Sequence, residues 1–154
     1  MDGVQVMKDL LLTLGGRLGV SPLVPDEEGY VCILIDEVLL VHLVYDREAE
    51  ALRIFSELCA LPASDEKVVM RALLDANVLW RGSQGATLGV DLAKKVVTLA
   101  YREPLGLLTP ARLEQILEGF VMAGEYWIKR IGDIARDSSA PRLAAGVPLA
   151  GLRV

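Results

Sequence analysis

Apolar residues near the start of the chain recur at steps of three and four, which is the spacing of one helical face. The positions on this face are Met7, Leu10, Leu11, Leu14 and Leu18. Glycines at 15, 16 and 19 follow, and glycine is the usual residue where a helix ends. The pattern predicts an amphipathic helix over residues 4–18.

The next apolar runs have the composition and the alternation of β-strands. They cover residues 30–35 and 38–45, with Asp36 and Glu37 as the polar turn between them. Residues 51–58 fit either a helix or a strand, but the neighbouring hairpin and the Leu52/Ile54 alternation favour a strand. We therefore expect three adjacent antiparallel strands.

A second helix is predicted between Asp65 and Asn77. Ser64 or Asp65 can cap its start, and Asn77 suits the left-handed backbone found at or near helix ends. Its apolar residues cover more than one side, so we expect it to pack on its own sheet and on another surface. A subunit partner is the natural candidate for that surface.

The last part of the chain predicts a second hairpin and then a long helix. The hairpin covers residues 86–90 and 96–101, and the helix begins with Thr109 as cap and Pro110 at the first helical position. One apolar stripe then continues for about seven turns, through Leu113, Ile116, Leu117, Phe120, Trp127, Ile131 and Ile134. A helix of that length can cover most of one sheet face.

We expect one domain over residues 1–137, because 154 residues suit a single modest core. Proline and glycine among small residues predict a flexible tail over 138–154. Val147, Leu149 and Leu152 leave open the alternative that this tail docks on a groove.

Composition narrows the classes of partner. Hydrophobic residues make up 53% of the chain, yet its net charge is −5, so we expect an apolar interface or groove on an acidic protein. The acidic balance argues against binding to nucleic acid or an anionic membrane. Asp36 and Glu37 interrupt the most apolar stretch, which argues against a membrane span, and no secretion signal is apparent at the start.

The residues that usually carry chemistry occur without their usual partners. His42 stands alone in a strand, and Cys32 and Cys59 lack the spacing of a metal or redox motif, so we expect reduced thiols in a cytosol. The glycine-bearing loop 82–85 lacks the lysine of a phosphate-binding loop. We predict no catalytic residue, no metal site and no cofactor.

A spaced series of residues crosses the second half of the chain. It reads Leu73-Leu74-x-Ala76-Asn77, Gly85-x-x-Leu88-Gly89-x-Asp91, Val97-x-Leu99, Leu113, Phe120, Ala123 and Trp127. This order resembles the CesT (Tir chaperone) family of type III secretion chaperones, class I, and the resemblance extends over residues 4–137. One departure is Glu37, where the family often has glycine after the aspartate of the hairpin turn.

The resemblance implies an α/β (α+β) fold in the order helix, three-stranded antiparallel unit, helix, β-hairpin and long C-terminal helix. It also implies a homodimer joined through the middle helix and the strand that follows. The candidate interface residues are Val69, Met70, Leu73, Leu74, Ala76, Trp80, Leu88 and Val90. Trp127, by its helical spacing with Phe120, is instead expected in the core.

The function that the resemblance implies is the binding of an extended segment near the amino terminus of a secreted effector. The chaperone would keep this segment unfolded and competent for secretion in the bacterial cytoplasm. The ATPase of the secretion machinery is a further candidate partner. The alternatives are a protein-binding or regulatory domain of similar fold without a role in secretion and, last, an enzyme.

The candidate effector-binding residues lie on the sheet face opposite the helices and on the first helix. They are Leu11, Leu14, Cys32, Leu34, Leu40, His42, Val44 and Phe55. This assignment assumes that Ile33, Ile35, Val41, Leu43, Leu52 and Ile54 face the helices. The alternative is that a partner subunit or the tail covers the candidate effector-binding residues.

Overall fold

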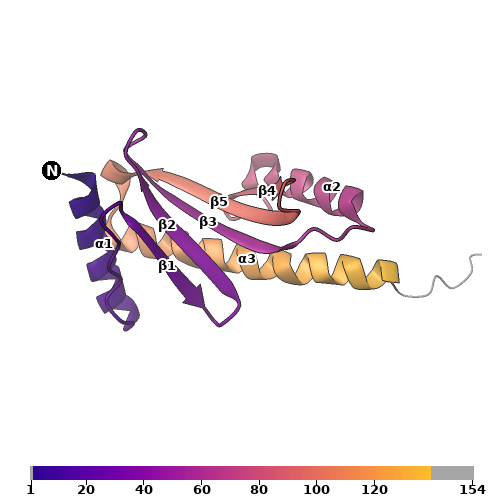
Figure 1. Cartoon of the computed structure of the whole chain (residues 1–154), viewed down its shortest axis with the longest axis horizontal. Coiled ribbons are helices and arrows are strands. Elements are labelled where there is room, and N and C mark those ends of the chain that lie inside the picture. Colours follow the sequence, from indigo (N-terminus) through magenta and orange to yellow (C-terminus); the bar gives the residue numbers. More distant parts are fainter. Residues whose placement is uncertain (1, 140–154) are drawn as a thin grey trace, which may run out of the picture.

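The computed structural model describes residues 2–139, which form one antiparallel sheet with helices packed on it (Figure 1). The elements are α1 (Gly3–Leu18), β1 (Tyr30–Ile35), β2 (Leu39–Asp46), β3 (Ala51–Ala60), α2 (Glu66–Asn77), η1 (Val78–Trp80), β4 (Thr87–Asp91), β5 (Val96–Pro104), η2 (Leu105–Leu107) and α3 (Pro110–Ser139). The predicted α+β class and order of elements are confirmed.

The strands form a single five-stranded sheet in the order β1-β2-β3-β5-β4. The sequence predicts a three-stranded unit and a separate hairpin, and the structure joins them through the pairing of β3 with β5. That pairing runs from Ala51 opposite Pro104 to Ala60 opposite Val96, with a register shift between Glu57 and Cys59. The edge strands of the sheet are therefore β1 and β4.

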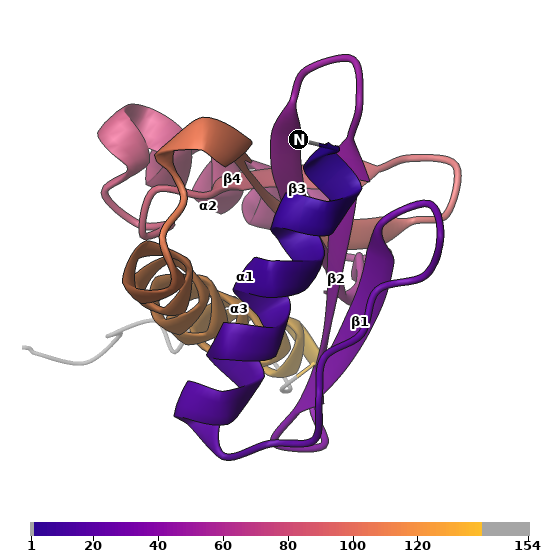
Figure 2. The same ribbon diagram turned by 90° about the vertical axis from the view of Figure 1, so that its left-hand side faces the viewer.

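Helix α1 begins and ends where its local sequence predicts. The Asp2 carboxylate accepts a hydrogen bond of 3.2 Å from the Val4 N–H, which satisfies one free donor of the first turn. Gly19 adopts a left-handed φ of 65°, and the Val20 N–H donates to the Gly15 carbonyl at 3.1 Å. Figure 2 shows α1 crossing one end of α3.

Helix α3 is the longest element, at 30 residues or about 45 Å. Its start is the predicted one, since Thr109 Oγ1 accepts from the Arg112 N–H at 3.1 Å. Phe120 and Trp127 are buried, as their spacing predicts. The helix continues two residues beyond the predicted domain boundary, and Ser138 there bonds to the buried Asp65 carboxylate. Most of the predicted tail, residues 140–154, lies outside the described residues.

The predicted division of the sheet into two faces is confirmed. Val41, Leu43 and Ile54 are buried against the helices. Leu34 and Leu40 lie on the opposite face and are exposed, Leu34 to 61%. We call the latter the open face of the sheet.

The turn between β1 and β2 is built from two residues with left-handed backbone. Asp36 and Glu37 have φ of 50° and 59°, and the Val38 N–H closes the turn on the Ile35 carbonyl at 3.0 Å. Turns with two positive φ values suit the twist of a hairpin, but they favour glycine and asparagine. Aspartate followed by glutamate therefore forms this turn at a conformational cost.

We expect Glu37→Gly to raise the free energy of unfolding by about 0.5–1 kcal/mol. Relief of a left-handed residue gains about 1–2 kcal/mol, and the greater freedom of glycine in the unfolded chain offsets part of it. Urea denaturation measures the difference, with Glu37→Ala as the control that retains the strain. A loss of stability in Glu37→Gly would contradict the turn geometry.

Candidate functional site

A continuous apolar surface lies on the open face of β1, β2 and β3. We call it the open-face patch and define it by Tyr30, Cys32, Leu34, Leu40, His42, Val44 and Phe55. The strand register places Cys32, His42 and Phe55 side by side in one row across three strands, and Leu34 opposite Leu40. The open-face part of the predicted binding residues is thus brought together in one place.

His42 is held at the centre of the patch by its two aromatic neighbours. Its ring stacks on Phe55 with centroids 4.7 Å apart and on Tyr30 with centroids 5.9 Å apart. The Tyr30 hydroxyl lies 2.9 Å from His42 Nδ1. A hydrogen bond with the Cys32 thiol, together with desolvation, raises the pKa of the Tyr30 hydroxyl above its usual value. The cluster forms a packed aromatic surface.

In its second half, β1 has outward-facing backbone groups that are free to pair with another strand. The bond from the Tyr45 N–H to the Gly29 carbonyl makes the odd residues of β1 face β2, so the N–H and C=O groups of Tyr30, Cys32 and Leu34 point outward. Asp26 occupies those of Tyr30 with two bonds of 2.9 Å. The backbone groups of Cys32 and Leu34 remain available for an added strand.

An apolar groove lies beside this open edge, on the helix side of the sheet. Its volume is about 640 Å³, and we call it the β1 groove. It is lined by Leu18, Val20, Leu23, Ile33, Leu34, Ile35, Asp36, Glu114, Leu117, Glu118, Val121 and Met122. Because α1 and the loop after it, β1 and α3 each supply one wall, local sequence patterns do not reveal the groove. Leu34 belongs both to this groove and to the open-face patch.

The opposite edge of the sheet, β4, is covered by the end of α2. The Asn77 side chain donates to the Leu88 carbonyl at 2.8 Å and accepts from the Leu88 N–H at 2.9 Å. Its amide thus pairs with the edge as a neighbouring strand would. The prediction of a left-handed Asn77 is wrong, because its φ is −72°; Leu79 and Trp80 take that conformation instead.

Leu79 and Trp80 project from the molecule just after α2. Leu79 and Trp80 both have φ of 53°, and they are 84% and 57% exposed. The following loop is tied down by Trp127, whose Nε1 donates to the Gly82 carbonyl at 2.8 Å. Val68, Leu74 and Val78 are further exposed apolar side chains of this segment, and we call these three residues with Leu79 and Trp80 the α2 ridge.

The structure corrects part of the predicted dimer interface. Val69, Leu73, Ala76 and Leu88 are buried in the core of their own chain, because this side of α2 packs on β4. They are therefore not surface residues of the protomer. The predicted residues that keep exposed or half-buried side chains are Met70, Leu74, Trp80 and Val90.

The structure also corrects the assignment of the first helix to the effector-binding surface. Leu11 and Leu14 are fully buried in the core, because the apolar face of α1 packs toward β2 and α3. The helix meets the β1 groove only near its end, at Leu18.

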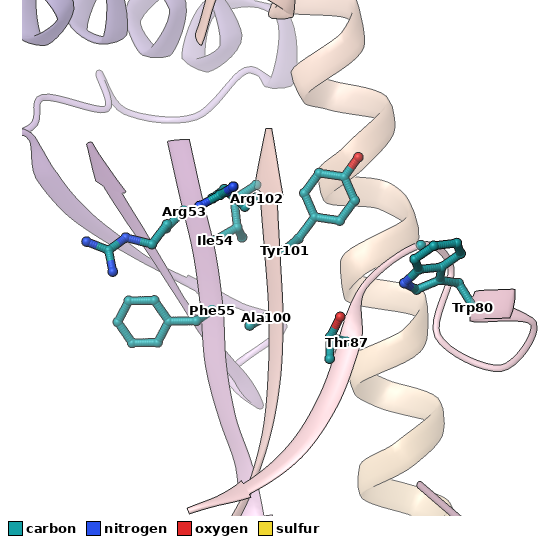
Figure 3. Close-up of a pocket in the computed structure, with 9 residues that line it drawn as sticks. Arg53, Ile54, Phe55, Trp80, Thr87, Ala100, Tyr101 and Arg102 are labelled. Carbon is teal, nitrogen blue, oxygen red and sulfur yellow. The ribbon is translucent and has the colours of Figure 1, made fainter. Parts of the chain in front are cut away.

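A second hollow, of about 620 Å³, lies on the open face between the open-face patch and the α2 ridge (Figure 3). Ala100 and Thr87 form its floor, while Phe55 and Trp80 stand at its two sides. Arg53 and Arg102 also line it. None of its lining residues is a carboxylate, a thiol or a histidine, so it has the composition of a binding surface.

Within residues 2–139, the structure contains no cluster of three or more His, Cys, Asp or Glu side chains arranged to hold a metal ion. No helix in that same range is long and apolar enough to cross a membrane.

Comparison with protein families matches residues 9–128 to the Tir chaperone protein (CesT) family. Among solved structures, a chain of the ExsC–ExsE complex is 27% identical, with a TM-score of 0.73 over 84% of this chain and 96% of its own length. A chain of the HopA1–SchA chaperone–effector complex is 21% identical, with a TM-score of 0.68 over 82% and 95%.

The Yersinia pestis type III secretion chaperone SycH, solved in complex with a stable fragment of YscM2, also matches. It is 19% identical, with a TM-score of 0.64 over 79% of this chain and 98% of that chain. At such identities the last two likenesses concern the fold. Comparison with curated proteins found no match.

The protein therefore belongs to the Tir chaperone protein (CesT) family, since the matched segment covers most of the chain. The resemblance seen in the sequence is confirmed. An effector-binding chaperone of type III secretion is the function that family and fold together support.

We expect Asn77→Ala to destabilise the protein by about 2 kcal/mol. It removes two hydrogen bonds, each of which contributes about 0.5–1.5 kcal/mol, and leaves backbone groups of β4 without partners. Urea denaturation measures the loss, and Gln5→Ala, which removes an exposed side-chain bond to Asp9, is the matched control. Equal stability of the two variants would show that the Asn77 amide does not support the β4 edge.

Proposed function

We propose that this chaperone binds an extended amino-terminal segment of a secreted effector along the open edge of β1. The observation that carries the proposal is the position of this edge between two apolar surfaces, the β1 groove on one side and the open-face patch on the other. The effector would be kept partly unfolded and competent for secretion.

An added strand would use both surfaces at once. Side chains of a strand alternate between the two faces of a sheet, so one set would enter the β1 groove while the next set would lie on the open-face patch. The backbone groups of Cys32 and Leu34 would supply main-chain hydrogen bonds, which need no particular client sequence. Selectivity would come from the apolar side chains.

The exposed apolar side chains can offset the cost of ordering an unfolded client. Ordering a disordered segment costs about 2–5 kcal/mol or more, and burial of apolar area is the contribution that can offset it. The exposed side chains of Leu34, Leu40 and Met122 are available for that contact. A chaperone that relied on polar contacts alone would need a more specific client sequence.

We propose a homodimer formed through the α2 ridge, with Met70 and Val90 at its margin. Leu79 and Trp80 are held in one conformation, so little freedom is lost when a second copy packs on them. Large exposed apolar patches on soluble proteins indicate an interface. The client surface along β1 lies at the other edge of the sheet, so both contacts can form together.

The remaining features of the proposal follow from this role. The protein would act in the bacterial cytoplasm, where Cys32 and Cys59 stay reduced as free thiols. Binding and release of a client need no catalytic residue and no cofactor. The ATPase of the secretion machinery is proposed as the partner that receives the complex.

We predict that Leu34→Asp weakens client binding at least tenfold, that is by about 1.4 kcal/mol or more, because Leu34 lines both surfaces. Met122→Asp tests the β1 groove alone and Leu40→Asp the open-face patch alone. All three side chains are exposed, so folding is preserved. Candidate effectors from the same genome are co-expressed, the retained amino-terminal fragment is isolated, and its affinity is measured by calorimetry.

Val24→Asp is the matched control, because Val24 is also an exposed apolar residue but lines neither surface. Its affinity should stay within about twofold of the unaltered protein. Equal loss in all four variants, or no loss in Leu34→Asp, would contradict the proposed site. Failure to retain any effector fragment would instead favour a binding or regulatory domain without a role in secretion.

We predict that Leu79→Glu converts the homodimer to a monomer. The buried carboxylate pair at a symmetric interface would cost several kcal/mol, whereas the exposed side chain contributes little to the protomer itself. Light scattering should give twice the chain mass of 16.7 kDa for the unaltered protein and the single mass for the variant. Leu107→Glu, at an exposed residue outside the ridge, should remain dimeric; a dimeric Leu79→Glu would overturn the interface.

A further inference from the structure

The β1 groove differs from two other large hollows of the molecule in the charge of its lining. Arg53 and Arg102 line the hollow on the open face, and another hollow between α2 and α3 carries Arg81 and Arg130 beside the single carboxylate of Asp75. The charged residues that line the β1 groove are the carboxylates of Asp36, Glu114 and Glu118. The groove is therefore apolar inside and acidic at its rim.

The negative charge of this rim is only partly neutralised. Arg17 pairs with Glu114 at 2.6 Å. Within residues 2–139, no ion pair involves Asp36 or Glu118. An occupant that combines apolar side chains with positive charge would fit this surface best.

Residues 140–154 of the same chain have this composition. They contain Arg142 and Arg153, no aspartate or glutamate, and the apolar residues Leu143, Val147, Leu149, Leu152 and Val154. The rest of the protein is acidic, since the whole chain has a net charge of −5. The segment is therefore complementary to the groove in both polarity and charge.

The segment is also long enough to reach the groove from the end of α3. The groove contacts α3 between Glu114 and Met122, which lie about 26 to 38 Å before Ser139 along the helix axis at 1.5 Å per residue. An extended chain covers up to about 3.3 Å per residue, so the positions of Val147 and Leu152 can lie about 26 and 43 Å from Ser139. These two spans overlap.

We infer that residues 147–152 of the same chain occupy the β1 groove when no client is bound. Leu149 and Leu152 fill its apolar interior, and Arg153 lies near the acidic rim. The segment acts as an intramolecular competitor, which a client displaces; this competing role rests on the proposed function, whereas the docking itself does not.

Methyl NMR on the full-length, client-free protein tests the docking directly. With leucine, isoleucine and methionine methyl groups labelled, we expect cross-peaks from Leu149 or Leu152 to Ile35 and Met122. Leu149→Ser/Leu152→Ser should remove these contacts and shift the Ile35 and Met122 signals. Ala144→Ser/Ala145→Ser is the matched control, since it adds the same polarity to the segment and leaves its large apolar side chains unchanged.

Absence of these cross-peaks in the unaltered protein would overturn the inference. Cross-peaks found only between differently labelled copies in a mixed sample would assign the occupant to a second copy and also overturn it. A client fragment that binds along β1 without displacing the Leu149 and Leu152 signals would refute the competing role. None of these results depends on whether the client is a secreted effector.

A charge exchange tests the acidic rim. Arg142→Glu, only three residues beyond Ser139, is the control and should leave the bound population unchanged. Arg153→Glu should lower that population about twofold or more, since a surface ion pair becomes a repulsive contact. Adding Asp36→Lys/Glu118→Lys to that variant should restore the cross-peaks. Loss of contacts without restoration would contradict the assigned orientation of the segment.

Discussion

The pairing of β3 with β5 is the constraint on which the rest of the structure depends. It joins an amino-terminal three-stranded unit to the later hairpin, with register from Ala51–Pro104 to Ala60–Val96. Helix α3, with 30 residues, contacts β2, β3 and β5 and thus packs on strands of both units. Once α3 lies on the sheet, α1 can close the core at one end and create the β1 groove beside it.

The same pairing leaves two edge strands, of which β4 is covered by other parts of the chain and β1 is largely open. At β4, the end of α2 covers the edge and the Asn77 amide occupies the backbone groups of Leu88. At β1, Asp26 occupies only the first residue, and apolar surface flanks the remainder on both faces. An open edge is normally a liability for a soluble protein. For a chaperone, that edge is the place where an unfolded segment gains most from binding.

Much of the fold could be predicted from the sequence because its signals are local. The cap at Thr109, the apolar stripe of α3 and the alternation of β1 and β2 each depend on neighbouring residues, and they gave the element order and the open-face patch. The candidate site was harder to predict, because burial is decided by tertiary packing. Leu11, Leu14 and Leu73 have the same apolar character as exposed binding residues, yet they belong to the core.

The features that the sequence does not reveal depend on contacts between distant segments or on unusual backbone geometry. The β1 groove combines walls from three parts of the chain. Asn77 could equally have ended α2 in a left-handed conformation, but its side chain binds the backbone of Leu88 instead. Leu79 and Trp80 adopt a left-handed conformation that large side chains rarely take. Hydrophobic periodicity carries no sign of that conformation.

Amide hydrogen exchange with and without a bound effector fragment, resolved for single residues of the two edge strands, tests client binding along β1 most directly. We expect strong slowing of exchange at Cys32 and Leu34 when the amino-terminal fragment of a co-purified effector binds, with the Leu88 amide of β4 unchanged. Slowing confined to β4 or α2, with free exchange retained along β1, would contradict binding of the client at the β1 edge.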